Sequence, residues 1–208
     1  LLKIQSKLDG ASVWGLLVSS ATQGLELAIN QLRLPFGSKI AVPALTFVAT
    51  ATAIQRCGHV PVVLDVDKHS WLLTPSQIPR DLSRTGIAAI IPVATFGMPQ
   101  NADEWSHWSL ATGVPVIIDA AASFGGQKTA DGVTVVFSLH ATKILSTAEG
   151  GLVVSRNQAL AEKMRMMSNF GIGLNGANLG TNAKMSEYHA AIGLAHLEVW
   201  PLQVKTRK

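Results

Sequence analysis

Short apolar segments alternate with stretches of helical periodicity along this chain, and this alternation constrains the fold more than any other feature. The predicted strands cover residues 15–19, 39–42, 61–65, 87–93, 114–119, 133–139 and 151–155. The earlier segments are continuously apolar, as in strands whose two faces are both buried. Strands that alternate with helices favour a parallel sheet covered on both sides. We therefore expect an α/β fold of three layers, α/β/α, around a mostly parallel sheet of about seven strands.

Helical spacing of apolar residues predicts the helices between these strands. They cover residues 22–34, 47–56, 102–112, 158–168 and 186–199, and a glycine- and asparagine-rich loop covers 169–182. Ser186 is expected to cap the last helix, which ends near Pro201. Gly58 and Gly113 are expected to end two of the others. Only a short connection separates the last two strands, so they must depart from simple alternation with helices.

The composition excludes several classes of protein. Of the 208 residues, 48% are hydrophobic and 14% charged, which is typical of a globular protein with a substantial core. The net charge of +4 is not gathered into a basic stripe, so no nucleic-acid partner is expected, although the charge can attract anionic small molecules. The single cysteine, Cys57, excludes an internal disulfide and no metal site is expected. Without a membrane-length apolar run or a signal peptide, a cytoplasmic protein is expected.

Lys143 is the residue around which the candidate site is organised. It lies in the short polar connection between the predicted strands 133–139 and 151–155. Between two buried strands desolvation lowers the pKa of a lysine, and the neutral amine can form a Schiff base. The hydroxyl of Ser138 can form a hydrogen bond to an anionic group beside this lysine. By itself, the spacing favours a simpler interpretation, a surface lysine in a β-loop-β connection.

Polar residues recur at the carboxyl ends of the predicted strands, where sheets of this type bind ligands. Ser20 and Thr22 open a helix, whose free N–H groups and dipole suit a phosphate, although each alone is more often a cap. Asp119 ends an apolar strand, and a buried carboxylate there requires a partner. That partner can be an arginine, the next segment, or the protonated ring nitrogen of a cofactor.

Together these residues match the needs of pyridoxal phosphate. Lys143 supplies the amine for an imine, and Asp119 keeps a pyridine nitrogen protonated. The first helix and Ser138 supply a phosphate site, and Phe47 supplies an aromatic face that can stack on the ring.

The sequence resembles the DegT/StrS-type sugar aminotransferases, of the fold type I pyridoxal-phosphate enzymes. The matching stretches span nearly the whole chain in the order of that family: residues 20–22, 42–51, 61–67, 92–97, 118–121, 137–143, 149–151 and 180–187.

The resemblance implies a role for each candidate residue. Lys143 corresponds to the catalytic lysine that binds the cofactor and carries the proton, Asp119 to the partner of the pyridine nitrogen, and Phe47 to the stacking ring. The phosphate site corresponds to Ala21, Thr22 and Ser138.

Two further residues are implied with less direct roles. Asn182 resembles an asparagine that reaches the cofactor phosphate from a neighbouring subunit, which requires a homodimer. His140 is placed near the substrate carboxylate, while a packed or solvent-facing histidine is an equally open interpretation.

The chain departs from the family pattern at several positions. Ala21 replaces a glycine of the phosphate cradle, and Ala122 replaces the Gln or His that touches the ring hydroxyl. Lys143 is retained where the related deoxysugar dehydratases carry histidine, which favours amino transfer. Family members continue into a C-terminal small domain, so residues 1–208 are expected to be the cofactor-binding large domain of a longer protein.

The resemblance thus implies a pyridoxal-phosphate-dependent aminotransferase of amino-sugar and polysaccharide biosynthesis. Its substrate is expected to be a nucleotide-linked keto-sugar, and its donor an amino acid such as glutamate. Two alternatives stay open: a dehydratase of the same fold, and a degenerate or truncated paralogue without enzymatic activity, which Ala21 and Ala122 make plausible.

Overall fold

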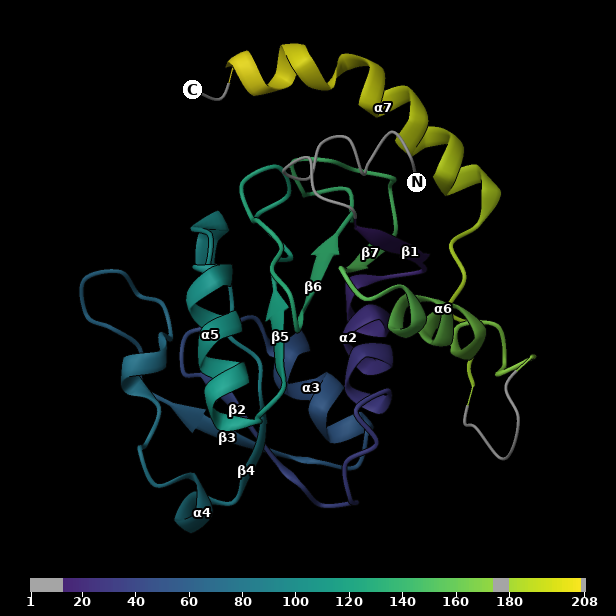
Figure 1. Ribbon diagram of the computed structural model, residues 1–208. Coiled ribbons are helices and arrows are strands. Elements are labelled where there is room, and N and C mark those ends of the chain that lie inside the picture. The colour runs from purple at the N-terminus through teal and green to yellow at the C-terminus, as the bar shows by residue number, and fades with distance from the viewer. Residues whose placement is uncertain (1–12, 174–179, 207–208) are drawn as a thin grey trace.

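A computed structural model describes residues 13–173 and 180–206 and shows three layers, with a central sheet between two layers of helices (Figure 1). This agrees with the expected α/β/α fold. The remaining residues, including part of the predicted loop 169–182 and the first residues of the chain, lie outside the described ranges.

The sheet has seven strands in the order β1-β7-β6-β5-β4-β2-β3. Five of them, β2 to β6, run parallel to one another, while β7 is antiparallel to both β6 and β1. The strands are β1 (Trp14–Val18), β2 (Lys39–Pro43), β3 (Val60–Leu64), β4 (Ile87–Ile90), β5 (Val116–Asp119), β6 (Val133–Ser138) and β7 (Gly151–Ser155). The short connection between β6 and β7 thus produces the antiparallel pair that departs from alternation, as expected.

The helices divide between the two faces of this sheet. They are α2 (Ala21–Asn30), α3 (Val48–Arg56), α4 (Leu82–Thr85), α5 (Ala102–Thr112), α6 (Gln158–Met167) and α7 (Glu187–Thr206), with short 3₁₀ turns η1 (Pro75–Gln77) and η2 (Thr95–Gly97). Buried residues of α2, α3 and α6 pack in one apolar cluster, and those of α5 and α7 pack in the other.

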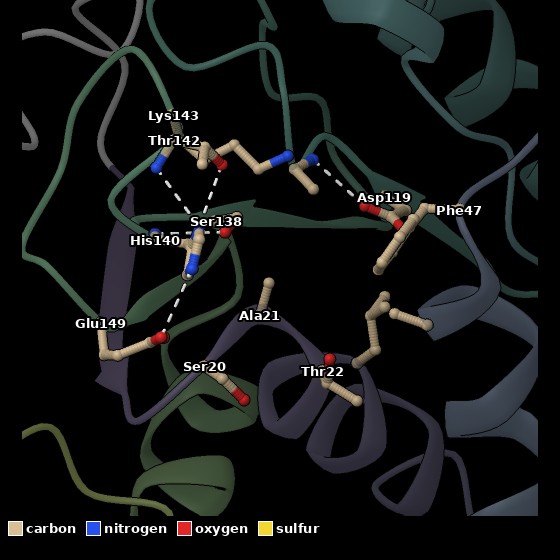
Figure 2. Close-up of a pocket in the computed structure, with 14 residues that line it drawn as sticks. Ser20, Ala21, Thr22, Phe47, Asp119, Ser138, His140, Thr142, Lys143 and Glu149 are labelled. Carbon is tan, nitrogen blue, oxygen red and sulfur yellow. Dashed lines mark hydrogen bonds and ion pairs between the residues drawn. The ribbon is translucent and has the colours of Figure 1, made fainter.

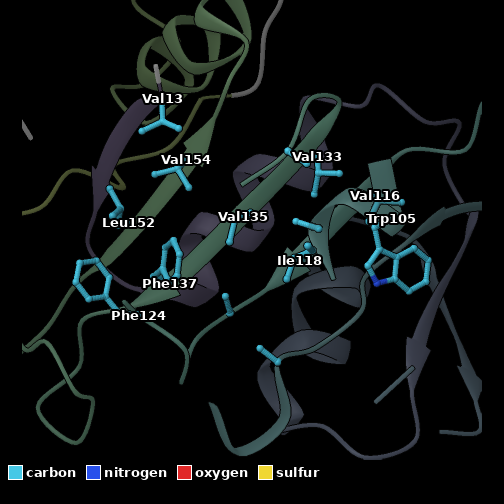
Figure 3. Close-up of a cluster of buried hydrophobic side chains, with 14 of the residues drawn as sticks. Val13, Trp105, Val116, Ile118, Phe124, Val133, Val135, Phe137, Leu152 and Val154 are labelled. Carbon is cyan, nitrogen blue, oxygen red and sulfur yellow. The ribbon is translucent and has the colours of Figure 1, made fainter. Parts of the chain in front are cut away.

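Alternation along the strands builds these two cores. In β5, Ile117 faces the α2–α3–α6 layer, whereas Val116 and Ile118 face the α5–α7 layer (Figure 3). Successive side chains of a strand point to opposite faces, so a strand buried on both sides must be apolar throughout. On the α7 side, Phe124 stacks edge-on against Phe137 and Trp200, with ring centroids 5.5 and 5.2 Å away.

Three predicted boundaries are wrong by three or more residues. The helix predicted over 22–34 ends at Asn30. The strand predicted over 87–93 ends at Ile90, because Pro92 has no N–H with which to continue the ladder. The last helix continues through Pro201 to Thr206. Trp200 before the proline and Val204 after it both pack against the α5-side core, which compensates for the missing helical hydrogen bond.

The predicted capping residues are confirmed. Ser20 is the N-cap of α2, its Oγ accepting from the Gln23 N–H at 3.2 Å, and Ser186 Oγ accepts from the His189 N–H at 3.3 Å. Gly58 and Gly113 adopt left-handed φ angles of 78° and 72° just after α3 and α5. Over the described ranges, no helix is both long enough and apolar enough to cross a membrane.

Candidate active site

Two adjoining cavities lie at the carboxyl edge of the sheet, beyond the ends of β5 and β6. Their volumes are about 370 and 330 Å³, and four residues line both of them: Phe47, Asp119, Ala121 and Lys143. The sequence-predicted amine, carboxylate and aromatic ring therefore meet in one continuous hollow. Figure 2 shows the Lys143 side chain extending toward the side of the hollow where Asp119 lies.

Asp119 is fixed and almost completely buried at the end of β5. Its carboxylate accepts a hydrogen bond from Thr50 Oγ1 at 2.7 Å and another from the Ala121 N–H at 3.1 Å. Burial nevertheless raises the pKa of Asp119, against the opposing effects of these two bonds and of the Lys143 charge. A buried carboxylate that faces a cavity and is still destabilised in its charged form is suited to a cationic ligand group.

Thr50 is a functional candidate that sequence reasoning missed. It is fully buried in α3 and lies between Asp119 and Thr46, whose Oγ1 is 2.8 Å from its own. Because the Thr50 hydroxyl has one proton, which it donates to Asp119, the Thr46 hydroxyl donates to Thr50. The spacing of two threonines one helical turn apart was the available signal, but nothing local relates them to a strand 69 residues further along the chain.

Lys143 lies in the connection between β6 and β7, where the sequence places it, but it is less buried than expected. It is only half-buried, and it is fixed at its backbone by the 2.9 Å bond from its N–H to the His140 carbonyl. The connection, rather than the strands, therefore positions the amine, and the side chain reaches both cavities from there.

The predicted phosphate cradle is assembled at the start of α2. Ser20, Ala21, Thr22 and Ser138 all line the larger cavity. The first N–H groups of a helix have no partner within the helix, so those of Ala21 and Thr22 are free to face an anion. Gly151 makes this possible: a Cβ there would lie 2.6–2.7 Å from backbone atoms of Ser20 and Ala21, so only glycine lets β7 pass the helix start.

Of the remaining predicted residues, Phe47 and Ala122 line the cavities, whereas Asn182 does not. Phe47 is 77% exposed and its ring borders both cavities, and Ala122 lines only the smaller one. Asn182 is exposed, forms an isolated bridge with Asn169, and lines neither cavity of this subunit. Its role toward a second subunit stays a prediction.

His140 faces the larger cavity as part of a small polar group. The Thr142 N–H donates to His140 Nδ1 at 3.2 Å, so the ring proton lies on Nε2, which is 3.4 Å from Glu149 Oε1 (Figure 2). Both side chains are about half exposed. Glu149 lines the same cavity, and the sequence indicates it only as part of the stretch 149–151, because sequence spacing does not show that the β6–β7 connection folds back on itself.

These residues fit pyridoxal phosphate on the geometry of the hollow. A cradle of free N–H groups lies at one end, a buried carboxylate with a raised pKa at another, and an exposed aromatic ring and a lysine border the space between them. The volume is within the range of small-ligand sites, roughly 300–1,000 Å³.

Comparison with known proteins agrees with this arrangement. The model of the DegT/DnrJ/EryC1/StrS aminotransferase family matches residues 10–208. A protein of Bacillus cereus ATCC 10987 described as a PLP-dependent aminotransferase is 33% identical, with a TM-score of 0.88 over 98% of this chain and 58% of its own.

Two further solved structures are similar over most of this chain. DesI, solved in the presence of its TDP-sugar product, is 33% identical with a TM-score of 0.85, over 96% of this chain and 52% of its own. DesV of S. venezuelae is 25% identical with a TM-score of 0.83, over 96% and 55%. The chain thus spans a little more than half the length of these proteins.

Proposed function

We infer the function of this chain from its family, because it belongs to the DegT/DnrJ/EryC1/StrS aminotransferase family. The family and the similar solved structures are PLP-dependent aminotransferases. We propose that this chain carries the cofactor-binding part of such an enzyme, and that the enzyme transfers an amino group to a nucleotide-linked keto-sugar. The observation that supports the proposal most directly is that Lys143 and Asp119 border one hollow beside a helix N-terminus.

Each end of the cofactor would have its own binding residues. Lys143 would hold it through its amine, and Asp119 would receive the protonated ring nitrogen. The Phe47 ring would cover one face and Ala121 would border the space opposite. The free N–H groups at the start of α2, with Thr22 and Ser138, would bind the phosphate. When bound, pyridoxal phosphate supplies an electron-accepting ring that stabilises negative charge on the carbon next to the reacting amine.

The protein groups carry out the proton transfers and the positioning. With its amine free, Lys143 Nζ would take a proton as general base and return it as general acid. Asp119, held in place by hydrogen bonds from Thr50 and Ala121, would stabilise the positive charge of the protonated ring nitrogen. His140 is half-exposed on the cavity side nearest Glu149, where it can orient the donor or the sugar.

Substrate and assembly belong to the same proposal. DesI was solved with a TDP-sugar product, and its similarity to this chain supports a nucleotide-linked sugar as acceptor. Glutamate is the proposed donor. A homodimer is proposed in which Asn182 reaches the partner's phosphate site.

Spectroscopy and product analysis test the proposal together. With pyridoxal phosphate, the purified protein is expected to show an absorbance band at roughly 410–430 nm. Borohydride should then fix the cofactor to the peptide that contains Lys143, as detected by mass spectrometry. Without either signal, a scaffold that lacks the enzymatic function would be the better description.

The product identifies the reaction. An aminated sugar nucleotide that forms only with an amino donor supports aminotransfer. A deoxygenated sugar formed without a donor would show the dehydratase reaction instead.

A further inference from the structure

Two large aromatic side chains lie in contact on the surface, Trp71 and Phe96. Their ring centroids are 6.3 Å apart at an interplanar angle of 66°, and the residues are 54% and 81% exposed. We refer to this pair as the aromatic platform. Such a large apolar surface left in water is unfavourable unless something covers it.

Both residues are held in a backbone conformation that side chains rarely adopt. Trp71 and Phe96 have φ angles of 59° and 52°. The Trp71 N–H donates to the Asp67 carbonyl at 2.8 Å, and the Asp67 N–H donates to the Leu72 carbonyl at 2.9 Å, which closes the turn on both sides. Left-handed backbone in a non-glycine residue persists only where its surroundings impose it, and it is concentrated at ligand sites.

The turn that carries Phe96 is fixed to the candidate active site itself. The carbonyl of Gly97 accepts from Ser123 Oγ at 3.0 Å, and Gly97 lies so close to the Ala122 carbonyl that a Cβ would be 3.0 Å from that oxygen. The turn that carries the Phe96 ring is therefore anchored to the segment that follows Asp119.

The platform is continuous with the reactive hollow. Phe96 lines the smaller cavity together with Lys143 and Asp119, and Trp71, which contacts Phe96, is not among the residues that line it. A cavity of about 330 Å³, which also borders the cofactor site, is too small for a whole nucleotide-linked sugar. A substrate that occupies this cavity with its keto group at Lys143 therefore extends out past Phe96.

We propose that the aromatic platform binds the nucleobase of the sugar-nucleotide substrate by stacking, and so determines affinity for the nucleotide part. This rests on the proposed function. A flat base offers a π-face to either ring, and stacking of this kind is typically lost when the aromatic residue is replaced by alanine. Trp71 and Phe96 are thus specificity residues for the acceptor, with no role toward the amino donor.

Separate half-reactions distinguish this proposal from the proposed function. The donor half-reaction, in which glutamate converts the cofactor to its amine form, is followed by absorbance without any sugar. If the wild type fails in it, the proposed function fails. If the wild type completes both half-reactions, the platform can be tested in the second.

Alanine variants provide the test. Trp71→Ala and Phe96→Ala are each expected to raise the KM for the sugar nucleotide roughly tenfold, and Trp71→Ala, at a position outside the cavity lining, should leave the donor half-reaction unchanged. Trp71→Phe and Phe96→Tyr retain a ring and should restore most of the affinity. Phe36→Ala is the matched control, because Phe36 is 90% exposed but lies against Gly58, at the amino end of β3.

A free nucleoside diphosphate identifies the part of the substrate that is bound. Thymidine diphosphate should inhibit the wild type competitively, with a Ki raised roughly tenfold in both alanine variants. An unchanged Ki together with a raised KM would place the sugar ring on the platform and overturn the assignment to the base. An unchanged KM in the alanine variants would also overturn the proposal. So would a loss of dimers, measured by light scattering, as the only effect, because it would show that the platform is a subunit contact.

Discussion

The two reactive groups of the hollow are held in opposite ways. Asp119 ends a strand in the interior of the sheet, is 4% exposed, and accepts hydrogen bonds from a helix on one side and from its own chain on the other. Lys143 lies in an irregular connection, half-buried, next to the exposed pair of His140 and Glu149.

The difference corresponds to what each group is proposed to do. A carboxylate that only stabilises a charge works best when it is preorganised and does not move. A lysine that binds a cofactor, leaves it and transfers protons must change position, and a connection packed on one side permits this. The following variants test how far this contrast between a rigid and a mobile group holds.

Lys143→Ala should have the largest effect. Without the amine there is neither a covalent hold on the cofactor nor a proton carrier, so amino transfer should fall by at least about a thousandfold. The absorbance band and the borohydride-trapped peptide should also disappear. Lys128→Ala, at an exposed position away from both cavities, is the control. Retention of the trapped adduct in Lys143→Ala would show that another lysine binds the cofactor.

Asp119→Asn should lower activity by about a hundredfold or more, because a neutral amide cannot stabilise a protonated ring nitrogen. In the cofactor-free protein, the same substitution should increase stability. Removing an uncompensated buried charge should raise the free energy of unfolding near pH 7, by about 1 kcal/mol or more.

The pH dependence gives an independent check on Asp119. Because burial raises its pKa, the folded protein binds a proton there more tightly than the unfolded chain does. The corresponding stability is fully present below the unfolded pKa of 3.8 and is lost as the pH rises through the raised folded value. Denaturation of the cofactor-free protein in this window should show that loss in the wild type and not in Asp119→Asn. The same slope in both would mean that Asp119 does not titrate as described.

Thr50→Val should have an intermediate effect. Valine keeps the shape but removes the proton donated to Asp119 Oδ2, so the pKa of Asp119 should rise further. Cofactor affinity is expected to fall about tenfold, the effect of losing one hydrogen bond to a charged group. Fluorescence titration with pyridoxal phosphate measures it, and Thr50→Ser, which retains the hydroxyl, should bind like the wild type. Equal affinity for Thr50→Val would show that Asp119 is rigid without its α3 partner.

His140→Ala and Glu149→Gln should have the smallest effect on folding. Their contact is about half exposed, and even a full ion pair at the surface contributes only about 0–1 kcal/mol, so the free energy of unfolding in urea should change by less than about 1 kcal/mol. A larger loss in either variant would mean that the β6–β7 connection is as rigid as the Asp119 region, which would remove the contrast.

Much of the site could be predicted because its residues follow strands whose pattern is unmistakable. Asp119, Ser138 and Thr22 each come just after an apolar run or at the start of a helix, and parallel strands bring their carboxyl ends to one edge. Thr50 and Glu149 were missed because each acts through a partner that only folding brings close. Likewise, the passage of α7 through Pro201 depends on packing against Phe124, which no local rule contains.

The order of apolar strands and helices in the sequence determined the three layers and the edge at which the site forms, since period and polarity are local properties of the chain. The tertiary structure alone decided that Asp119 is bonded by Thr50 and that Trp71 meets Phe96. These contacts join segments far apart in sequence, and their geometry arises only when the layers pack.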